Sequence, residues 1–381
     1  MFLERAHDWA VIMDHTIQIG NLKVLIVLGL RLSHLPQNRA LSLSDVHPLF
    51  VLPMTSSTGG RIKRVLDSVQ EKYGSIRLVV ADEGPDLKLG IKLFAAENQR
   101  VDYVPDIVHT LAHLLDSELK NNSSWQFLTK KASVLRIKLL QSEHAHIIPP
   151  QRREKARYLN LEELIKWAKR ILVSFTSSEI SEKDREGIKA HFSWVLDITS
   201  DIYFFEELWN VVAITRDLIR TKGITLNSAE ELANLLGQLS LSVKALQFAA
   251  KALDFVLQQS FKAEHGERLL GSSEIIESLI GTLKQRLNSQ SRSSFTGSIL
   301  MVSTLVGEVN MIMTHEAMEA IPVKEILEWT EAFVGDTIQK KRREFQAATK
   351  NSSACDRSES LLENGTESGN IFAEELLLKT G

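Results

Sequence analysis

The chain of 381 residues is 44% hydrophobic and 24% charged, with a formal net charge of −3 at pH 7. These values are ordinary for a soluble globular protein and leave room for two or three domains. The longest apolar run, Val24 to Leu30, is too short for a transmembrane helix, and the charges in the first residues are not typical of a secretory signal. The single cysteine, Cys355, excludes a disulfide within the chain and a cysteine-rich metal site, so we expect a cytoplasmic location.

Residues 9–118 alternate short apolar runs with helical patterns. The apolar runs predict five strands, at Trp9–Met13, Lys23–Leu30, His47–Pro53, Ile76–Ala81 and Val101–Val104. Helices are predicted at 62–73 and 86–98, and a third begins after the fifth strand. Because helices separate only the later strands, the first three strands are predicted to be antiparallel and the later ones parallel. This segment is therefore predicted to be an α/β domain, residues 1–118, with a mixed five-stranded sheet.

Strand patterns end at about residue 118, and amphipathic helical patterns follow. Residues 119–270 are predicted to be all-helical, with one or two helices at 230–261. Residues 271–348 are predicted to form the C-terminal helices, at 271–288, 295–313 and 323–347. Residues 349–381 are rich in Ser, Asn, Glu and Gly, and we expect a disordered tail.

Two aspartates directly follow predicted strands. Asp14 comes after the first strand and Asp82 after the fourth. In open sheets with crossover helices, ligand sites lie at the carboxyl ends of the strands. Carboxylates that converge there suit Mg²⁺, which prefers oxygen ligands. Taken singly, each aspartate is also compatible with a turn residue or a helix cap.

A candidate for a third carboxylate lies on the predicted helix at 271–288. Glu277, Gly281 and Lys284 follow at i, i+4 and i+7, beside the buried stripe of this helix. A carboxylate, a residue without a side chain and a cation in one row suit a metal ion and an approaching phosphate. The alternative is a solvated Glu–Lys surface. Glu206 and Glu207 are rivals for the third position, and Asp86 is a rival of Asp82.

Further polar residues follow the fifth strand. Asp106 and His109 lie where the next helix begins, and we expect His109 to lie near the edge of the sheet that carries the candidate site, where it would support a metal ligand or a phosphate. His113 shares a helix face with His109, but no acid lies between them as in zinc proteases, so we interpret His113 as a half-buried packing residue.

A basic run lies within the helical region. Arg152, Arg153, Lys155 and Arg157 precede Tyr158, and together they could bind phosphates of a DNA end. A solvated start of a helix is the alternative interpretation of the same run.

Four segments resemble bacterial DDE-type transposases. They are residues 9–23 around Asp14, 77–90 around Asp82, 103–109 with Asp106 and His109, and 270–284 around Glu277. The resemblance implies an α/β plus α protein, with an RNase H-like mixed five-stranded sheet. It also implies a large all-helical insertion before the last catalytic helix, which carries Glu277.

The resemblance implies cleavage and strand transfer at transposon ends. Two Mg²⁺ or Mn²⁺ ions would be held by Asp14, Asp82 and Glu277, with Asp14 bridging both ions. The substrate would be double-stranded DNA, both transposon ends and target, bound by a homo-oligomer at the bacterial nucleoid and not at a membrane.

Two alternatives stay open at this point. Such transposases usually carry a DNA-end-binding domain ahead of the first strand, and this chain begins just before that strand. We therefore also expect that the protein could be a truncated, non-catalytic derivative that acts as a DNA-binding or oligomerising partner. The other alternative is a structural helical protein with an incidental α/β portion.

Overall fold

A computed structural model of the protein describes residues 4–19, 22–151, 158, 161–289, 295–307, 311–336 and 340–349. The chain divides into two compact units, with the boundary between Ala320 and Ile321. Among the described residues, none of the helices combines the length and the apolar character needed to cross a bilayer.

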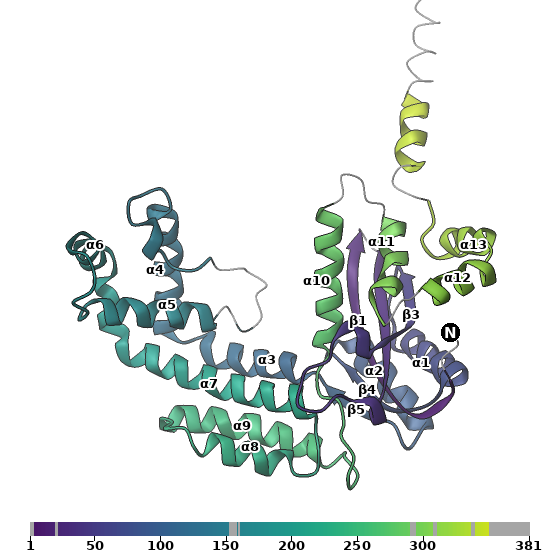
Figure 1. Cartoon of the computed structure of the whole chain (residues 1–381), viewed down its shortest axis with the longest axis horizontal. Coiled ribbons are helices and arrows are strands. Elements are labelled where there is room, and N and C mark those ends of the chain that lie inside the picture. Colours follow the sequence, from purple (N-terminus) through teal and green to yellow (C-terminus); the bar gives the residue numbers. More distant parts are fainter. Residues whose placement is uncertain are drawn as a thin grey trace, which may run out of the picture. The chain divides into compact units, whose positions relative to one another are not determined.

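The first unit contains a five-stranded mixed sheet. Its strands are β1 (Ala6–Ile19), β2 (Leu22–Arg31), β3 (His47–Met54), β4 (Gly74–Ala81) and β5 (Asp102–Pro105). They lie in the order β3-β2-β1-β4-β5 (Figure 1). Neighbouring strands among the first three are antiparallel, whereas β4 is parallel to both β1 and β5. This is the predicted α/β fold, an RNase H-like sheet with a helical insertion.

Helices cover both faces of this sheet. On one face, α1 (Gly59–Tyr73) and α2 (Pro85–Glu97) pack over a buried core to which β1 contributes Val11 and Met13. On the other, α10 (Glu274–Asn288) lies against β1 and α11 (Phe295–Val302) against β3 (Figure 1). Because both faces are covered, β2 is buried from Val24 to Leu30, which explains its continuous apolar run.

The contact between α1 and α2 depends on a glycine. A Cβ atom built at Gly90 would lie 2.4 Å from Cβ of Ile62 and 2.8 Å from the carbonyl oxygen of Gly59. Both distances are too short for a real contact, and one involves backbone. The absence of a side chain at Gly90 therefore allows the two helices to approach each other closely.

Replacing Gly90 by alanine is expected to lower the free energy of unfolding by about 1–3 kcal/mol, because the added methyl group forces the helices apart. Urea denaturation measures the change. Gly60→Ala on α1 is the matched control, since nothing lies within 4 Å of a Cβ built there. Alanine is the better helix former, so the control should be neutral or more stable by roughly 0.5–1 kcal/mol. Equal urea midpoints for Gly90→Ala and the wild type would refute this account of the contact.

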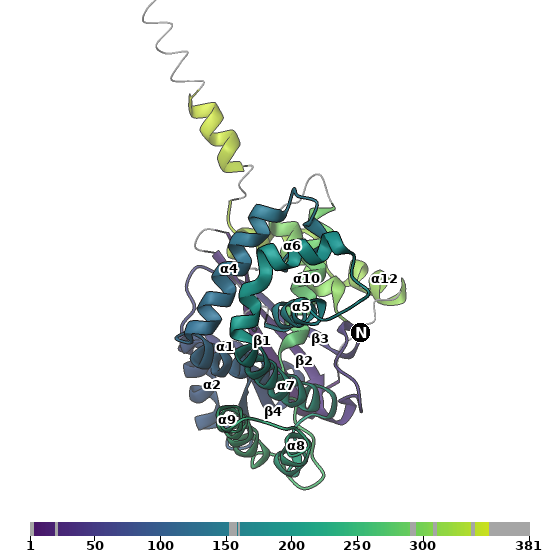
Figure 2. The same cartoon turned by 90° about the vertical axis from the view of Figure 1, so that its left-hand side faces the viewer.

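The helical insertion begins directly after β5. It consists of α3 (Ile107–Leu119), α4 (Ser123–Leu139), α5 (Leu161–Ser174), α6 (Glu182–Phe192), α7 (Thr199–Lys222), α8 (Ser228–Leu236) and α9 (Val243–Ser260). The longest of them, α7, has 24 residues, and α3, α5, α8 and α9 pack against it (Figures 1 and 2). The region predicted to contain one or two helices at 230–261 thus contains two, separated by a short loop.

The C-terminal helices differ from the prediction. The expected helix at 295–313 is divided into α11 and α12 (Met311–Ala320). The expected helix at 323–347 is also interrupted: α13 covers Val323–Phe333, and residues 340–349 are helical again. Gly335 follows α13 with a φ of +69°. That conformation is outside the helical range and costs glycine little, so the helix ends there. The expected tail beyond Thr349 lies outside the described residues.

Candidate metal centre

Three aspartates follow the residues at which the parallel pairing among β1, β4 and β5 ends. The pairing ends at Met13↔Ala81 between β1 and β4 and at Ala81↔Pro105 between β4 and β5. The next residues are Asp14, Asp82 and Asp106. Since neighbouring strands lie roughly 4.8 Å apart, the register places the three residues in one row across the sheet.

The structure corrects the prediction that Asp14 ends a strand. β1 continues to Ile19, and Asp14 pairs with Ile26 of β2. Only the pairing with β4 stops before Asp14, because β4 ends at Ala81 whereas the hairpin with β2 continues. Asp14 therefore lies in a regular strand that is paired with β2 on one side but no longer with β4 on the other. Asp82 follows the end of its strand, as predicted.

The side of the sheet follows from the alternation of side chains along a strand. Val11 and Met13 face the core under α1 and α2. Asp14 alternates with Met13, so its side chain is placed on the opposite face. This is the face against which α10 packs.

Asp82, Asp106 and His109 form a compact group of possible metal ligands. One ligand atom from each lies within 4.8 Å of the others. Nδ1 of His109 is 3.2 Å from Oδ2 of Asp82, and His109 lies in the first turn of α3. Asp106 and His109 therefore lie beside Asp82 at this edge of the sheet, and their supporting role stays a prediction.

Asp106 is fully buried and its two oxygens differ. Oδ1 accepts hydrogen bonds from the backbone N–H of Val108 and of Ser273, each at 3.2 Å. Oδ2 is buried and has no hydrogen-bond partner among the described residues. A buried carboxylate oxygen without a partner costs free energy, and a metal ion would supply the missing interaction. The carboxylates and the imidazole of this group therefore fit a divalent cation that accepts oxygen and nitrogen ligands.

A pocket of about 310 Å³ opens at this edge of the sheet. It is lined by Asp14, His15, Asp82, Glu83, Gly84, Asp86, Leu87, His109 and His113. His113 is exposed and its ring lies 5.1 Å from that of His109, so the interpretation of His113 as a half-buried packing residue was wrong. The two histidines are one turn apart on α3, and both line the pocket.

His15 and Asp86, which also line the pocket, belong to a second polar cluster. Nε2 of His15 lies 2.8 Å from Oδ2 of Asp86 and 3.0 Å from Oγ of Ser57. Partial burial raises the pKa of Asp86, but hydrogen bonds from Ser57 and His15 outweigh it and leave the pKa below its usual value. Asp86, considered earlier as a rival of Asp82, is therefore an anion bound to His15. Sequence reasoning missed His15, although it directly follows Asp14.

Glu277 lies on α10, whose start is attached to the site through the bond from the backbone of Ser273 to Asp106. Glu277 and Lys284 are exposed, while Ile276 and Leu279 form part of the buried face. Glu277 is not among the residues that line the pocket. Its assignment as the third carboxylate stays a prediction.

The rivals of Glu277 have partners inside the helical insertion. Both lie on α7. Oε1 of Glu206 accepts a hydrogen bond from Nζ of Lys169 at 2.6 Å, and Glu207 accepts from the backbone N–H and the hydroxyl of Ser242. These contacts connect helices of the insertion and give both glutamates a structural role.

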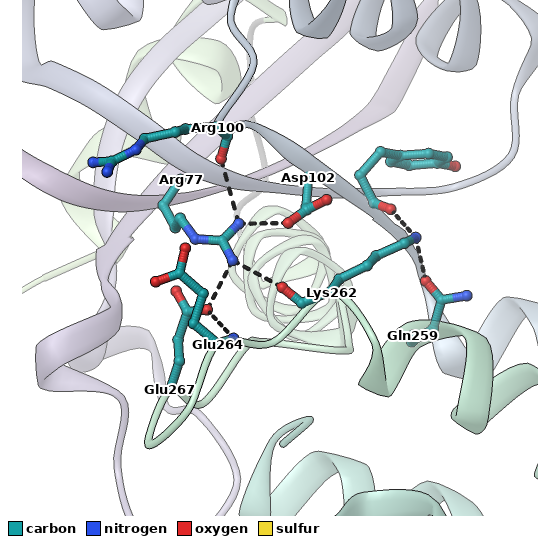
Figure 3. Close-up of polar contacts among 8 residues, drawn as sticks. Arg77, Arg100, Asp102, Gln259, Lys262, Glu264 and Glu267 are labelled. Atoms are coloured by element: carbon teal, nitrogen blue, oxygen red, sulfur yellow. Dashed lines mark hydrogen bonds and ion pairs between the residues drawn. The ribbon is translucent and has the colours of Figure 1, made fainter. Parts of the chain in front are cut away.

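A polar junction connects the end of the insertion to the sheet (Figure 3). Arg77 on β4 is mostly buried and donates hydrogen bonds to Asp102, to Glu267 and to the carbonyl oxygen of Lys262, at 2.6–2.9 Å. The ammonium group of Lys262 donates to the carbonyl oxygen of Tyr103 at 2.6 Å, and burial lowers its pKa. Residues 261–273, which we name the return segment, are thereby fixed to β4 and β5 before α10 begins.

Tyr103 extends this junction towards the metal centre. Its hydroxyl group donates to the carbonyl oxygen of Asp82 at 3.2 Å. Burial and the nearby carboxylates of Glu83 and Asp82 raise the pKa of the phenol, so it stays a donor at neutral pH. The backbone at Asp82 is therefore supported by the same residues that anchor the return segment.

The predicted DNA-binding residues Arg152, Arg153, Lys155 and Arg157 lie outside the described residues. Tyr158, which follows them, is buried, and its ring lies 5.7 Å from that of Trp209 on α7. Tyr158 thus packs against α7.

The sequence matches no protein-family model and no curated protein. Among solved structures, the chain is similar to the Drosophila P element transposase in a strand transfer complex. The identity is 13%, the TM-score is 0.36, and the match covers 80% of this chain and 78% of the transposase chain. At this level of similarity the fold rests on the sheet topology and its register, not on the neighbour.

Proposed function

We propose that the protein is a DDE-type DNA transposase of the bacterial kind, whose metal centre catalyses strand cleavage and strand transfer. The row of Asp14, Asp82 and Asp106 at one edge of an RNase H-like sheet is the observation that carries the proposal. The proposed substrate is double-stranded DNA at the transposon ends and in the target. We further propose that the enzyme acts as a homo-oligomer at the bacterial nucleoid.

The proposed metal ligands are Asp14, Asp82 and Glu277, and two Mg²⁺ or Mn²⁺ ions are the proposed cofactors. Asp14 lies on the face of the sheet that α10 covers, which supports a contribution from Glu277. The unpartnered oxygen of Asp106 supports a fourth ligand, with His109 beside it. Bound divalent ions would supply an activated water and neutralise charge on the reacting phosphate.

The chain's own residues have separable tasks in this proposal. The aspartates hold the ions, and the polar junction at Arg77 fixes the strands that carry them. His109 and His113 line the pocket, where their ring N–H groups can donate to phosphate oxygens. We also propose that residues 1–118 and 271–348 contribute to the catalytic core, with residues 119–270 as the insertion.

Divalent metal is expected to stabilise the native protein through this site. At a concentration about 100 times the dissociation constant, binding should raise the free energy of unfolding by about 2.7 kcal/mol. The measurement is the thermal unfolding of the wild type with increasing MnCl₂, compared with the same series for Asp82→Asn. The variant should show little or no metal-dependent shift.

The matched control is Asp197→Asn, which removes an exposed carboxylate of the insertion far along the chain from the aspartate row. It should keep the full metal-dependent shift. A wild-type midpoint that does not respond to Mn²⁺ or Mg²⁺ would contradict the metal centre and favour a non-catalytic derivative or a structural helical protein.

A further inference from the structure

An apolar helix face in the second unit lacks a partner among the described residues of that unit. α13 has its apolar residues at the spacing of one helix face, and none of its 11 residues is buried. Val323 is 70% exposed, Leu327 is 64% exposed and Phe333 is 40% exposed. A helix stripe of this kind normally faces a core, and an isolated helix of this length is marginal in water. Its regular apolar stripe therefore indicates a surface that is covered in the working protein.

The charges on α13 restrict what can cover it. The helix carries three glutamates, Glu325, Glu328 and Glu331, against the single cation Lys324. An acidic helix repels both DNA phosphates and anionic lipid headgroups, for which basic side chains are required. The composition of this face therefore fits a protein partner.

The positions of the charges favour a second copy of the same helix. Lys324 and Glu331 are seven residues apart, so they lie two turns apart on the same flank of the apolar stripe. When two identical helices pack in antiparallel orientation, the same flanks meet, and Lys324 of each copy lies beside Glu331 of the other. Antiparallel packing also opposes the two helix dipoles. In a parallel pair, the flank that carries Lys324 in one copy would meet the other flank of the second copy. The residue opposite Lys324 would then be Trp329 and not a carboxylate.

We propose that α13 is a homodimerisation surface, on which two copies of this chain pack α13 against α13 in antiparallel orientation. The apolar contact consists of Ile326, Leu327 and Phe333, and the Lys324–Glu331 pairs fix its register. The inference names the surface for the proposed homo-oligomer, but its argument does not use the metal centre. Because an 11-residue helix buries less area than a standard interface, the dimer is expected to be weak and concentration-dependent.

Sedimentation equilibrium of the full chain between about 1 and about 100 µM measures the association, which micromolar affinities make visible in this range. The wild type should change from monomer to dimer. Leu327→Glu should weaken dimerisation at least about tenfold, since it places a charge in the apolar contact. Val173→Glu on α5 is the matched control, because Val173 has the same 64% exposure as Leu327. It should dimerise like the wild type.

Charge reversal tests the orientation. Lys324→Glu alone should weaken the dimer, and Lys324→Glu combined with Glu331→Lys should restore it, because the exchanged charges again meet across an antiparallel pair. A wild type that stays monomeric throughout the range, or a Leu327→Glu variant that dimerises like the wild type, would overturn the surface. Failure of the double variant to recover would overturn the antiparallel arrangement. Metal-dependent stabilisation is measured separately, so failure of the proposed function is distinguishable from failure of this inference.

Discussion

Asp82→Asn is expected to abolish metal-dependent cleavage of DNA, with a loss of at least about 10³-fold, and Asp14→Asn is expected to do the same. Asparagine keeps the size of the side chain but removes the charge that holds a divalent ion, and metal-ion catalysis supplies several kcal/mol of transition-state stabilisation. The measurement is the rate at which plasmid DNA carrying the sequences that flank this gene is nicked in Mg²⁺ or Mn²⁺. Far-UV circular dichroism should show that both variants keep the fold.

Two further variants make this result specific. Asp86→Asn alters an anion that lines the same pocket but binds His15, and it should cost less than either ligand variant. Glu277→Gln tests the third proposed ligand and should cost as much as Asp82→Asn. Unchanged nicking by Asp14→Asn or Asp82→Asn would exclude the DDE mechanism. Unchanged nicking by Glu277→Gln alone would remove only Glu277 from the ligand set.

Substitutions at Asp106 should separate metal binding from folding. Asp106→Asn keeps an oxygen that can accept from Val108 and Ser273, but it replaces the unpartnered buried oxygen by an amide that cannot bind a cation. We expect metal affinity and cleavage to fall by about 10–100-fold, with little change in unfolding without metal. Isothermal titration with MnCl₂ measures the affinity.

Asp106→Ala removes both acceptors and has a different expected outcome. The N–H groups of Val108 and Ser273 lose their partner, so the free energy of unfolding without metal should fall by about 1–3 kcal/mol. If Asp106→Asn bound Mn²⁺ as tightly as the wild type, Asp106 would be a structural cap and not a ligand. If both variants were equally unstable without metal, the separation of the two oxygens would be wrong.

The sheet could be predicted because its strands are marked locally. The apolar run before Asp82 is bounded by Gly74 on one side and by Gly84 and Pro85 on the other, so its ends are visible in the sequence. Asp14 was placed at a strand end because the apolar run stops there. The strand continues because its pairing with β2 continues. Pairing between two strands depends on both of them, so the residues of one strand alone do not predict where it ends.

The site was less predictable because its contacts join distant parts of the chain. The burial of Asp106 depends on the backbone of Ser273, 167 residues later, and no local pattern reports that contact. The pairing of His15 with Asp86 spans 71 residues in the same way. Glu277 was identified through a resemblance, and its exposed position on α10 leaves its role to the experiment described above.

The two ends of the insertion meet beside the candidate metal centre. The backbone N–H of Ile107 donates to the carbonyl oxygen of Gly271 at 3.0 Å, so the chain leaves and returns at one point. Bringing the two ends of the unfolded insertion together costs conformational entropy. This cost is smaller once the insertion has folded. During synthesis from the N-terminus, the aspartate row therefore emerges well before α10. The nascent protein thus contains the acidic residues early, but α10 can pack beside them only after the whole insertion has been made.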